Sequence, residues 1–191
     1  DYDFWKEADV EKTVQSVRRP LDYSYTLYGV GGIVPRFVGK PETRYSRQLV
    51  YKWADVRGAL DRLRAYPGSP YDGVILEYTN PESGGSVAPT LGIAIQLLPP
   101  GEPTRAHRHT ASTVYCVVEG RDFTQVERTR LEWSENDVFV VPAWAWHHHV
   151  NREGGAEAVL FSVTDAPALE KLGLYREDAR TETGDIVRVV G

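Results

Sequence analysis

All five histidines of this 191-residue chain lie in two short clusters within the stretch from Gly101 to Asn151. The first cluster is H-R-H, beginning at His107, and the second is H-H-H, beginning at His147. Alternate residues of a β-strand point to the same face, so His107 and His109 place two imidazoles side by side, with about 6–7 Å between their Cα atoms. Neutral imidazole is the commonest side-chain metal ligand. The pattern predicts that His107, His109 and His147 bind one cation and leave other positions open, as catalytic metal sites do.

Each of these histidines also has a plainer interpretation. His107 and His109 can be polar residues exposed at a strand edge, and His147 can be a core histidine bonded to a backbone carbonyl. The spacing favours the metal role. His149 follows His147 by two residues, so on a strand it points to the same side and can face the same cavity. His148 points to the opposite side and is expected to be structural or to face solvent.

The composition is that of an ordinary globular chain, with 41% hydrophobic residues, 26% charged residues and a net charge of -5. This acidic balance argues against nucleic acid or an anionic membrane as a partner. No apolar run approaches the roughly 20 residues of a membrane span, and the first residues lack the pattern of a signal peptide. A single cysteine, Cys116, fits a reducing compartment, so we expect a cytoplasmic protein. The chain has no methionine, and we expect it to be trimmed or to be one part of a longer product.

Residues 1–70 are predicted to form an N-terminal arm with one helix, packing on the rest of the chain or on a neighbour. Asp1–Lys40 carries too many aromatic residues for a free linker. Apolar residues recur at three- and four-residue spacing in Tyr51–Tyr66, which predicts a helix that packs one face on a sheet.

Residues 71–191 contain short apolar segments about 8–12 residues apart, separated by Gly, Pro and Asn turns, which indicates an all-β sandwich or barrel with a C-terminal tail. A short helix is expected at Ala168–Leu172, capped by Asp165. The expected strands are Val74–Tyr78, Thr90–Leu98, Ser112–Val118, Thr124–Glu127, Arg130–Trp133, Val138–Val141, Ala158–Thr164 and the edge strand Ile186–Val190.

The spacing around both histidine clusters resembles the two cupin motifs. The matching positions are Gly101, His107, His109 and Gly120 in the first motif, and Pro142, His147 and Asn151 in the second. Cupins are double-stranded β-helices, or jelly rolls, with the metal inside the barrel. The resemblance therefore implies an all-β cupin jelly roll over 71–191, with the N-terminal arm and one or two short peripheral helices around it.

The chain departs from the general cupin pattern at four positions. Thr113 and Val114 stand where a glutamate ligand is usual, and Asn136 and Trp144 stand where glycines are usual. The missing carboxylate leaves three histidines as the expected ligand set.

The sequences H-R-H-T-x-S, W-H-x-H-x-N and L-G-L-Y-R-E resemble the gentisate 1,2-dioxygenase family, which includes salicylate and 1-hydroxy-2-naphthoate dioxygenases. The resemblance covers about Tyr78–Asp178. Members are usually bicupins, and V-Y-C-V-V-E-G resembles their C-terminal barrel. The family implies Fe(II) held by three histidines, and cleavage of a gentisate- or salicylate-type aromatic carboxylate by dioxygen. A substrate that chelates as a dianion, through its carboxylate and ortho hydroxyl, would supply the charge that three neutral imidazoles lack.

The resemblance implies roles for three further residues. His149 is expected to contact the substrate or dioxygen rather than the metal. Gln96 lies where the family places a pocket glutamine, although an amide bonded to a turn is an equal alternative. Tyr115 shares the parity of His107 and should face the cavity, at a position where the family's catalytic barrel often has an arginine.

Neighbouring polar and aromatic residues are assigned to the outside of the site. Arg105 and Arg108 are expected to be solvated, with Arg108 pointing away from the histidine face. Cys116 falls on the face opposite Tyr115. Trp144 and Trp146 are expected to pack the barrel mouth, although they could also line a pocket.

The first functional hypothesis is therefore an Fe(II) ring-cleaving dioxygenase that acts as a homo-oligomer on a small aromatic carboxylate. The second is a non-catalytic cupin half that supports the assembly of a partner barrel. The third is a cupin that binds a small molecule through nickel, manganese or zinc, because three imidazoles accept several divalent metals.

Overall fold

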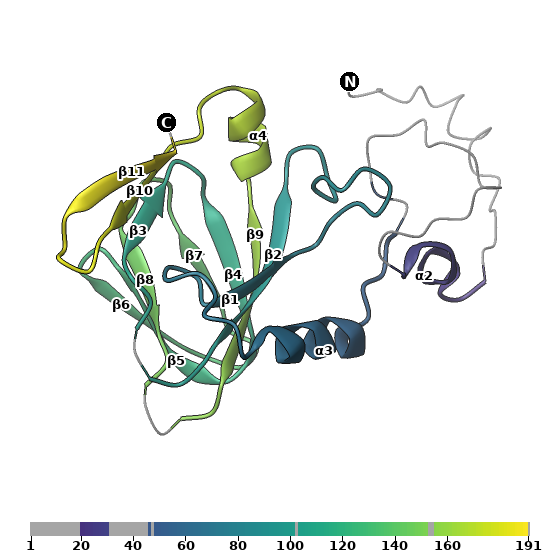
Figure 1. Ribbon diagram of the computed structural model, residues 1–191, viewed down its shortest axis with the longest axis horizontal. Coiled ribbons are helices and arrows are strands. Elements are labelled where there is room, and N and C mark those ends of the chain that lie inside the picture. The colour runs from purple at the N-terminus through teal and green to yellow at the C-terminus, as the bar shows by residue number, and fades with distance from the viewer. Residues whose placement is uncertain (1–19, 31–45, 47, 102, 153–154, 191) are drawn as a thin grey trace.

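The computed structural model describes residues 20–30, 46, 48–101, 103–152 and 155–190. Most of them form antiparallel strands, with short helices at the periphery (Figure 1). The helices are α2 (Tyr23–Tyr28), α3 (Trp53–Leu63) and α4 (Ala166–Lys171). The strands are β1 (Val74–Glu77), β2 (Gly92–Leu98), β3 (His107–His109), β4 (Thr113–Glu119), β5 (Arg121–Val126), β6 (Thr129–Ser134), β7 (Val138–Val141), β8 (His147–Val150), β9 (Ala158–Thr164), β10 (Glu177–Arg180) and β11 (Ile186–Val190).

The strands form two facing sheets. One has the order β1-β2-β9-β4-β7, and the other has the order β11-β10-β3-β8-β5-β6. Neighbours in these orders are mostly distant in sequence, as in a jelly roll, and Figure 1 shows the two sheets closing around a common interior. The predicted all-β cupin fold is confirmed.

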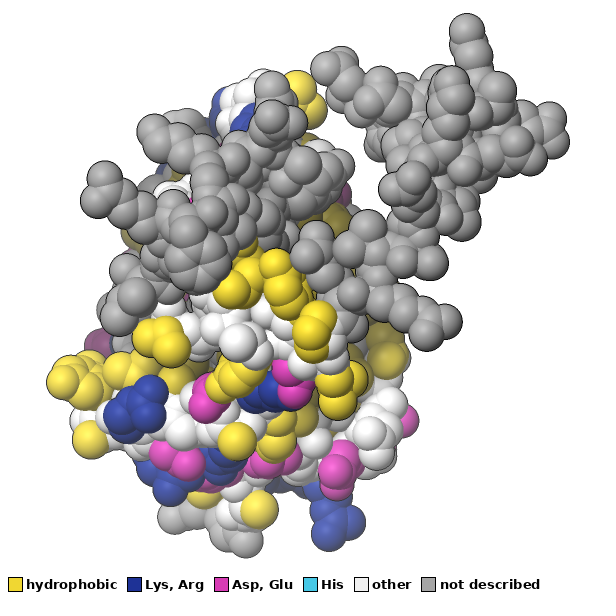
Figure 2. Space-filling model, turned by 90° about the vertical axis from the view of Figure 1, so that its right-hand side faces the viewer, with side chains coloured by type: hydrophobic (Ala, Val, Ile, Leu, Met, Phe, Trp, Pro, Cys, Tyr) yellow, Lys and Arg dark blue, Asp and Glu magenta, His cyan; other side chains and the backbone are white. Residues whose placement is uncertain are grey.

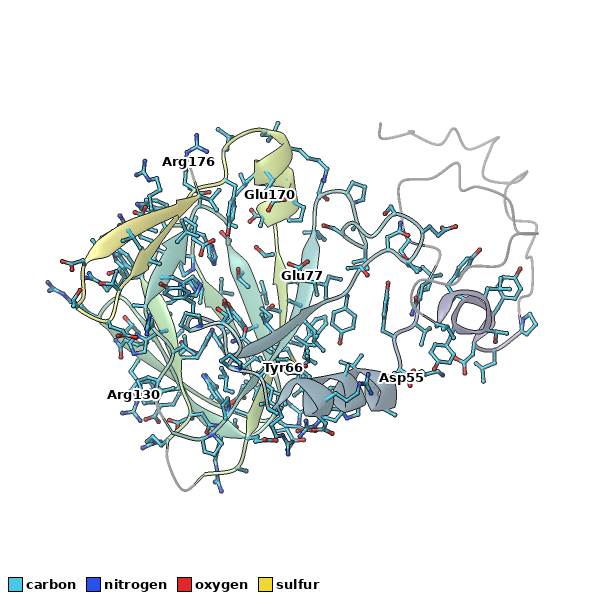
Figure 3. All side chains as sticks on the ribbon, in the orientation of Figure 1. Asp55, Tyr66, Glu77, Arg130, Glu170 and Arg176 are labelled. Atoms are coloured by element: carbon cyan, nitrogen blue, oxygen red, sulfur yellow. The ribbon has the colours of Figure 1, made fainter. Side chains whose placement is uncertain are left out.

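The main core lies between the sheets, where side chains fill the interior (Figure 3). Strand β4 alternates, because Thr113, Tyr115 and Val117 are buried while Val114 is 43% exposed on the outer face. The buried members of this core are Leu98, Tyr115, Val117, Val126, Trp133, Phe139, Val141, Ala158 and Leu160.

A second core lies under helix α3, on the outer face of the five-stranded sheet. Leu60 is fully buried there and packs with Val74, Ile95, Leu97 and Val159. The predicted helix at Tyr51–Tyr66 is confirmed with shorter ends. Alternate residues of β2 therefore serve two cores, with Ile95 and Leu97 facing the helix and Leu98 facing the barrel interior.

Helix α2 is tied to α3 by polar contacts. Lys52 Nζ lies 2.6 Å from an Asp22 carboxylate oxygen, and the Tyr25 hydroxyl donates to Asp55. Asp55 lies on α3 at the end nearest α2 in Figure 3. Figure 2 shows this side of the molecule, where hydrophobic side chains lie among Lys, Arg, Asp and Glu side chains. The predicted arm over Asp1–Lys40 falls mostly outside the described residues.

Several elements differ from the prediction. Helix α2 was not expected, and β5 begins at Arg121 rather than at Thr124. Strand β10 was not expected, because its sequence E-D-A-R has no apolar alternation; it is nevertheless held between β3 and β11, with Asp178 buried against Arg108. Helix α4 begins at Ala166 rather than Ala168, with a proline in its first turn. None of the helices in the described ranges is long and apolar enough to cross a membrane.

Gly120, which closes the first cupin motif, is required by the turn between β4 and β5. Its φ is 86°, in the left-handed region. A Cβ atom at this position would lie 2.8 Å from the Ala158 Cα atom. The motif glycine thus allows β4 to turn against the start of β9.

Replacing Leu60 with alanine should destabilise the protein by about 2–5 kcal/mol, because it leaves a cavity between α3 and the sheet. Urea unfolding measures this change. Leu172→Ala is the matched control, since Leu172 is 70% exposed, and it should change the free energy of unfolding by less than about 0.5 kcal/mol. Equal effects of the two substitutions would show that α3 does not cover a core.

Candidate metal centre

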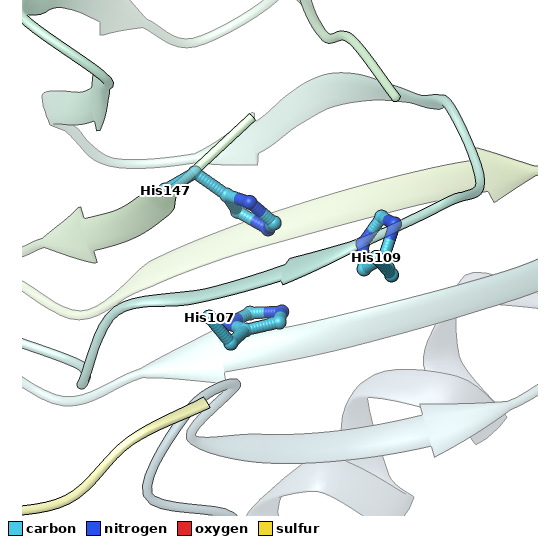
Figure 4. Close-up of side chains that lie close together, drawn as sticks. All are labelled: His107, His109 and His147. Carbon is cyan, nitrogen blue, oxygen red and sulfur yellow. The ribbon is translucent and has the colours of Figure 1, made fainter. Parts of the chain in front are cut away.

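Three histidines converge inside the barrel. His107 and His109 come from β3, and His147, the first residue of β8, pairs with His107 in the sheet. One ring nitrogen from each histidine lies within 4.8 Å of the other two. Ring centroids are 4.2 Å apart for His107 and His147, and 5.2 Å apart for His109 and His147. Figure 4 shows the three rings meeting from two stretches of backbone.

Backbone carbonyls fix the orientation of two of these rings. Nδ1 of His109 bonds to the carbonyl oxygen of Ala111 at 2.8 Å, and Nδ1 of His147 bonds to that of Ala145 at 3.1 Å. A carbonyl only accepts, so each Nδ1 carries the proton and each Nε2 keeps its lone pair. Nε2 of His147 is buried and has no hydrogen-bond partner among the described residues. This donor set fits a divalent cation.

Burial keeps the imidazoles of His107 and His147 neutral. It lowers the pKa of His107 to about 3, with a smaller contribution from the neighbouring histidines. It also lowers the pKa of His147 well below the usual value, and His107 adds to this effect. A metal ligand must be unprotonated, so these rings are in the binding form at neutral pH.

His149 is held differently from the three clustered histidines. Its Nδ1 lies 2.9 Å from Thr124 Oγ1, which also accepts a hydrogen bond from Trp133 Nε1 at 3.0 Å. The Thr124 hydroxyl is fully buried, and His149 Nδ1 is the acceptor available to its hydrogen. The proton of His149 then sits on Nε2, which is buried and has no partner in the described part of the chain. His149 is thus arranged as a hydrogen-bond donor.

Tyr115 lies inside the barrel, as its parity predicts. Its ring stacks on Phe139 with centroids 5.0 Å apart and meets the edge of His149 at the same distance. Burial raises the pKa of Tyr115, so the phenol is neutral. This position therefore offers a hydroxyl without a charge.

Gln96 also belongs to the interior face. Its neighbours Ile95 and Leu97 face helix α3, which turns Gln96 towards the barrel. The side chain is 1% exposed, and its Nε2 has no hydrogen-bond partner among the residues described. The alternative, an amide bonded to a turn, is not supported for this nitrogen.

The solvated position predicted for Arg108 is wrong. Arg108 does point away from the histidine face, but its guanidinium pairs with the buried Asp178 at 2.8 Å. It also lies 4.3 Å and 4.6 Å from the ring centroids of Trp144 and Trp146. Asp178, on the unexpected strand β10, supplies the partner that sequence alone did not indicate. Arg105 lies at the surface and pairs with Glu182.

Asn136 and Trp144, which stand where the cupin motif usually has glycines, keep the positive backbone φ angle that glycine favours. Asn136 has a φ of 72° and Trp144 has a φ of 63°. Asparagine tolerates this conformation, whereas it is strained for a bulky residue such as tryptophan. The Trp144 backbone N–H donates to the His109 carbonyl at 2.7 Å, so the strained residue anchors β3 beside the site.

Asp165 does not cap helix α4 with its side chain, although it occupies the N-cap position. Its carboxylate instead accepts a hydrogen bond of 2.8 Å from the backbone N–H of Ser112. The competing partner on the adjacent loop explains why the expected cap is absent.

Three residues near the histidines were missed by sequence reasoning. Tyr175 stacks on His109 with centroids 6.4 Å apart, and Tyr71 meets His107 edge-on at 5.7 Å. Asp72 Oδ1 lies 3.8 Å from His107 Nε2. Only Tyr175 had a signal, because it lies in L-G-L-Y-R-E.

The buried histidines predict that the metal-free protein loses stability on acidification. An unfolded histidine has a pKa of about 6.5, whereas burial lowers that of His107 to about 3 and those of His147 and His149 well below the usual value. The unfolded chain binds more protons between these values, so the free energy of unfolding falls as the pH drops below about 6.5. The slope should be at most about 1.4 kcal/mol per pH unit for each histidine.

Urea unfolding of the metal-free protein between about pH 5 and pH 7.5 measures this slope in the range where unfolded histidines titrate. His107→Asn removes one of the three groups and should flatten the curve. Identical slopes for the wild type and this variant would contradict the assignment of a neutral buried His107.

The comparisons with known proteins agree with this architecture. The cupin domain family model matches residues 94–164. A 5-aminosalicylate 1,2-dioxygenase from Comamonas is 46% identical over 143 residues, which cover 74% of this chain and 38% of that protein. Gentisate 1,2-dioxygenase 1 from Aquipseudomonas alcaligenes is 34% identical over 165 residues, which cover 86% of this chain and 46% of that protein.

Solved structures give the same result. Salicylate 1,2-dioxygenase from Pseudoaminobacter salicylatoxidans, solved as adducts with gentisate, matches with a TM-score of 0.73 and 27% identity over 83% of this chain and 44% of that chain. The chain thus spans less than half the length of these relatives. Domain match, sequence relatives and structural neighbours together show that the chain contains a cupin domain and is similar to gentisate- and salicylate-type ring-cleaving dioxygenases.

Proposed function

We propose that this chain is part of an Fe(II)-dependent dioxygenase that cleaves the ring of a gentisate- or salicylate-type aromatic carboxylate. His107, His109 and His147 are the proposed iron ligands. The observation that carries the proposal is the meeting of three imidazole nitrogens within 4.8 Å inside the barrel, two of them on rings held by carbonyls with Nε2 left to bind. The names of the relatives, which are aromatic-acid dioxygenases, support the same reaction class.

The charge balance of the site suits an anionic substrate. Three neutral imidazoles leave the charge of a divalent cation uncompensated, so a carboxylate with an ortho hydroxyl is a favourable chelating partner. When ferrous iron is bound, it supplies the redox chemistry by which dioxygen reacts with an electron-rich ring. His149 would donate a hydrogen bond from Nε2, and Gln96 and Tyr115 would contact the ring or its substituents; their burial on the interior face supports these roles.

A non-catalytic cupin half is the second candidate. Tyr115 favours it, because a neutral phenol stands where the family's catalytic barrel often has an arginine to pair with the substrate carboxylate. In this case the barrel would support the assembly of a partner barrel.

We further propose a homo-oligomer in the cytoplasm, with neither nucleic acid nor membrane as a partner. Strand β11 supports association, because it lies at the edge of its sheet and exposes Ile186, Val187, Val189 and Val190. The net charge of -5 supports the absence of nucleic acid.

Replacing either His107 or His147 with alanine should abolish binding of one equivalent of iron while the fold survives. Elemental analysis after anaerobic loading measures the metal, and circular dichroism measures the fold. His148→Ala is the matched control, since His148 lies between two cavity-facing histidines but is not in the cluster. Unchanged iron content in His107→Ala or His147→Ala would refute the ligand assignment.

Oxygen uptake separates the two candidate functions. The iron-loaded full-length polypeptide should consume dioxygen with gentisate, 5-aminosalicylate or salicylate, and the ring absorbance should disappear at the same rate. His107→Ala should reduce this activity to background. Full iron loading without turnover on any of these substrates would reject the dioxygenase and favour the supporting barrel.

A further inference from the structure

A carboxylate lies beside the three histidines, although no residue of the cupin motifs supplies one. Asp72 belongs to the loop between α3 and β1, and its Oδ1 is 3.8 Å from His107 Nε2. Tyr71, the preceding residue, contacts the edge of the His107 ring. The loop therefore brings an oxygen donor to the same end of the barrel as the imidazole cluster.

The loop that carries Asp72 is held on several sides. Ser69 Oγ donates to Asp72 Oδ2 at 2.8 Å, and Ser69 and Gly73 exchange two backbone hydrogen bonds of 2.8 Å and 2.9 Å. The Arg105 backbone N–H donates to the Pro70 carbonyl at 2.8 Å, which links the loop to the segment entering β3. One oxygen of Asp72 is thereby held by serine while the other faces His107.

Asp72 lies beside histidines, with no Lys or Arg among the described residues as an ion-pair partner. Its side chain is only 28% exposed. A partly buried carboxylate without a Lys or Arg partner is unfavourable. A bound cation would stabilise it.

We propose that Asp72 is the carboxylate of the metal centre, which faces the cation beside His107, His109 and His147 and compensates part of its charge. The general cupin pattern places a glutamate at the position of Thr113 or Val114; here an equivalent charge comes from the loop before β1. The inference rests on the proposed metal site. If Asp72 compensates one positive charge of the cation, a chelating substrate has one negative charge fewer to supply.

Titration of the metal-free full chain with Co²⁺, followed by its visible absorption, tests this role without any turnover. Asp72→Asn keeps the size and the hydrogen bond to Ser69 but removes the charge, and it should weaken Co²⁺ binding about 10–100-fold. Asp72→Glu restores the charge and should recover most of the affinity. Ser69→Ala loosens the loop while keeping the charge, and it should weaken binding much less than Asp72→Asn.

Asp137→Asn is the matched control, because Asp137 is also held by a serine hydroxyl, that of Ser134 at 2.9 Å, but is not near the cluster. It should leave the affinity unchanged. If Asp72→Asn binds Co²⁺ as tightly as the wild type, or if Ser69→Ala weakens binding as much as Asp72→Asn, the proposed role of the charge is wrong. If the wild type itself binds no Co²⁺, the three-histidine site is wrong as well, which distinguishes the two failures.

Discussion

The pairing of β3 with β8 is the constraint on which the candidate site depends. His107 and His147 are register partners across these strands, so backbone hydrogen bonding brings together two rings that are 40 positions apart in sequence. His109 joins them because alternate residues of a strand share a face. A shift of one residue in this register would turn the histidines towards the opposite face of the sheet.

The residues around the site both bury the histidine rings and fix their orientation. Carbonyls of Ala111 and Ala145 orient two imidazoles, while Thr124 orients His149. Neutral rings cost less to bury than charged ones, which fits the lowered pKa values of His107, His147 and His149. Asn151, the last residue of the second cupin motif, donates to the Leu98 and Ala156 carbonyls at 2.7 Å and 3.0 Å, and so joins β8 to the opposite sheet.

The outer side of β3 is polar but not solvated. Arg108 is covered by two tryptophans and paired with Asp178, whose pKa is lowered by its hydrogen bond with Arg108. The histidine strand is therefore covered on both faces, by the histidine and tyrosine rings of the barrel interior on one side and by an arginine–tryptophan layer on the other. Trp144, with its strained backbone, links this layer to the His109 carbonyl.

The sequence by itself determined the all-β fold, most strand positions and the three clustered histidines, because alternation and histidine spacing are local properties of a strand. It did not determine β10, whose charged sequence is stabilised only by β3, β11 and Arg108. It also gave no sign of Asp72, which reaches His107 through a loop 35 positions away. Such contacts depend on how the barrel closes, and only the tertiary structure decides which distant loop meets which strand.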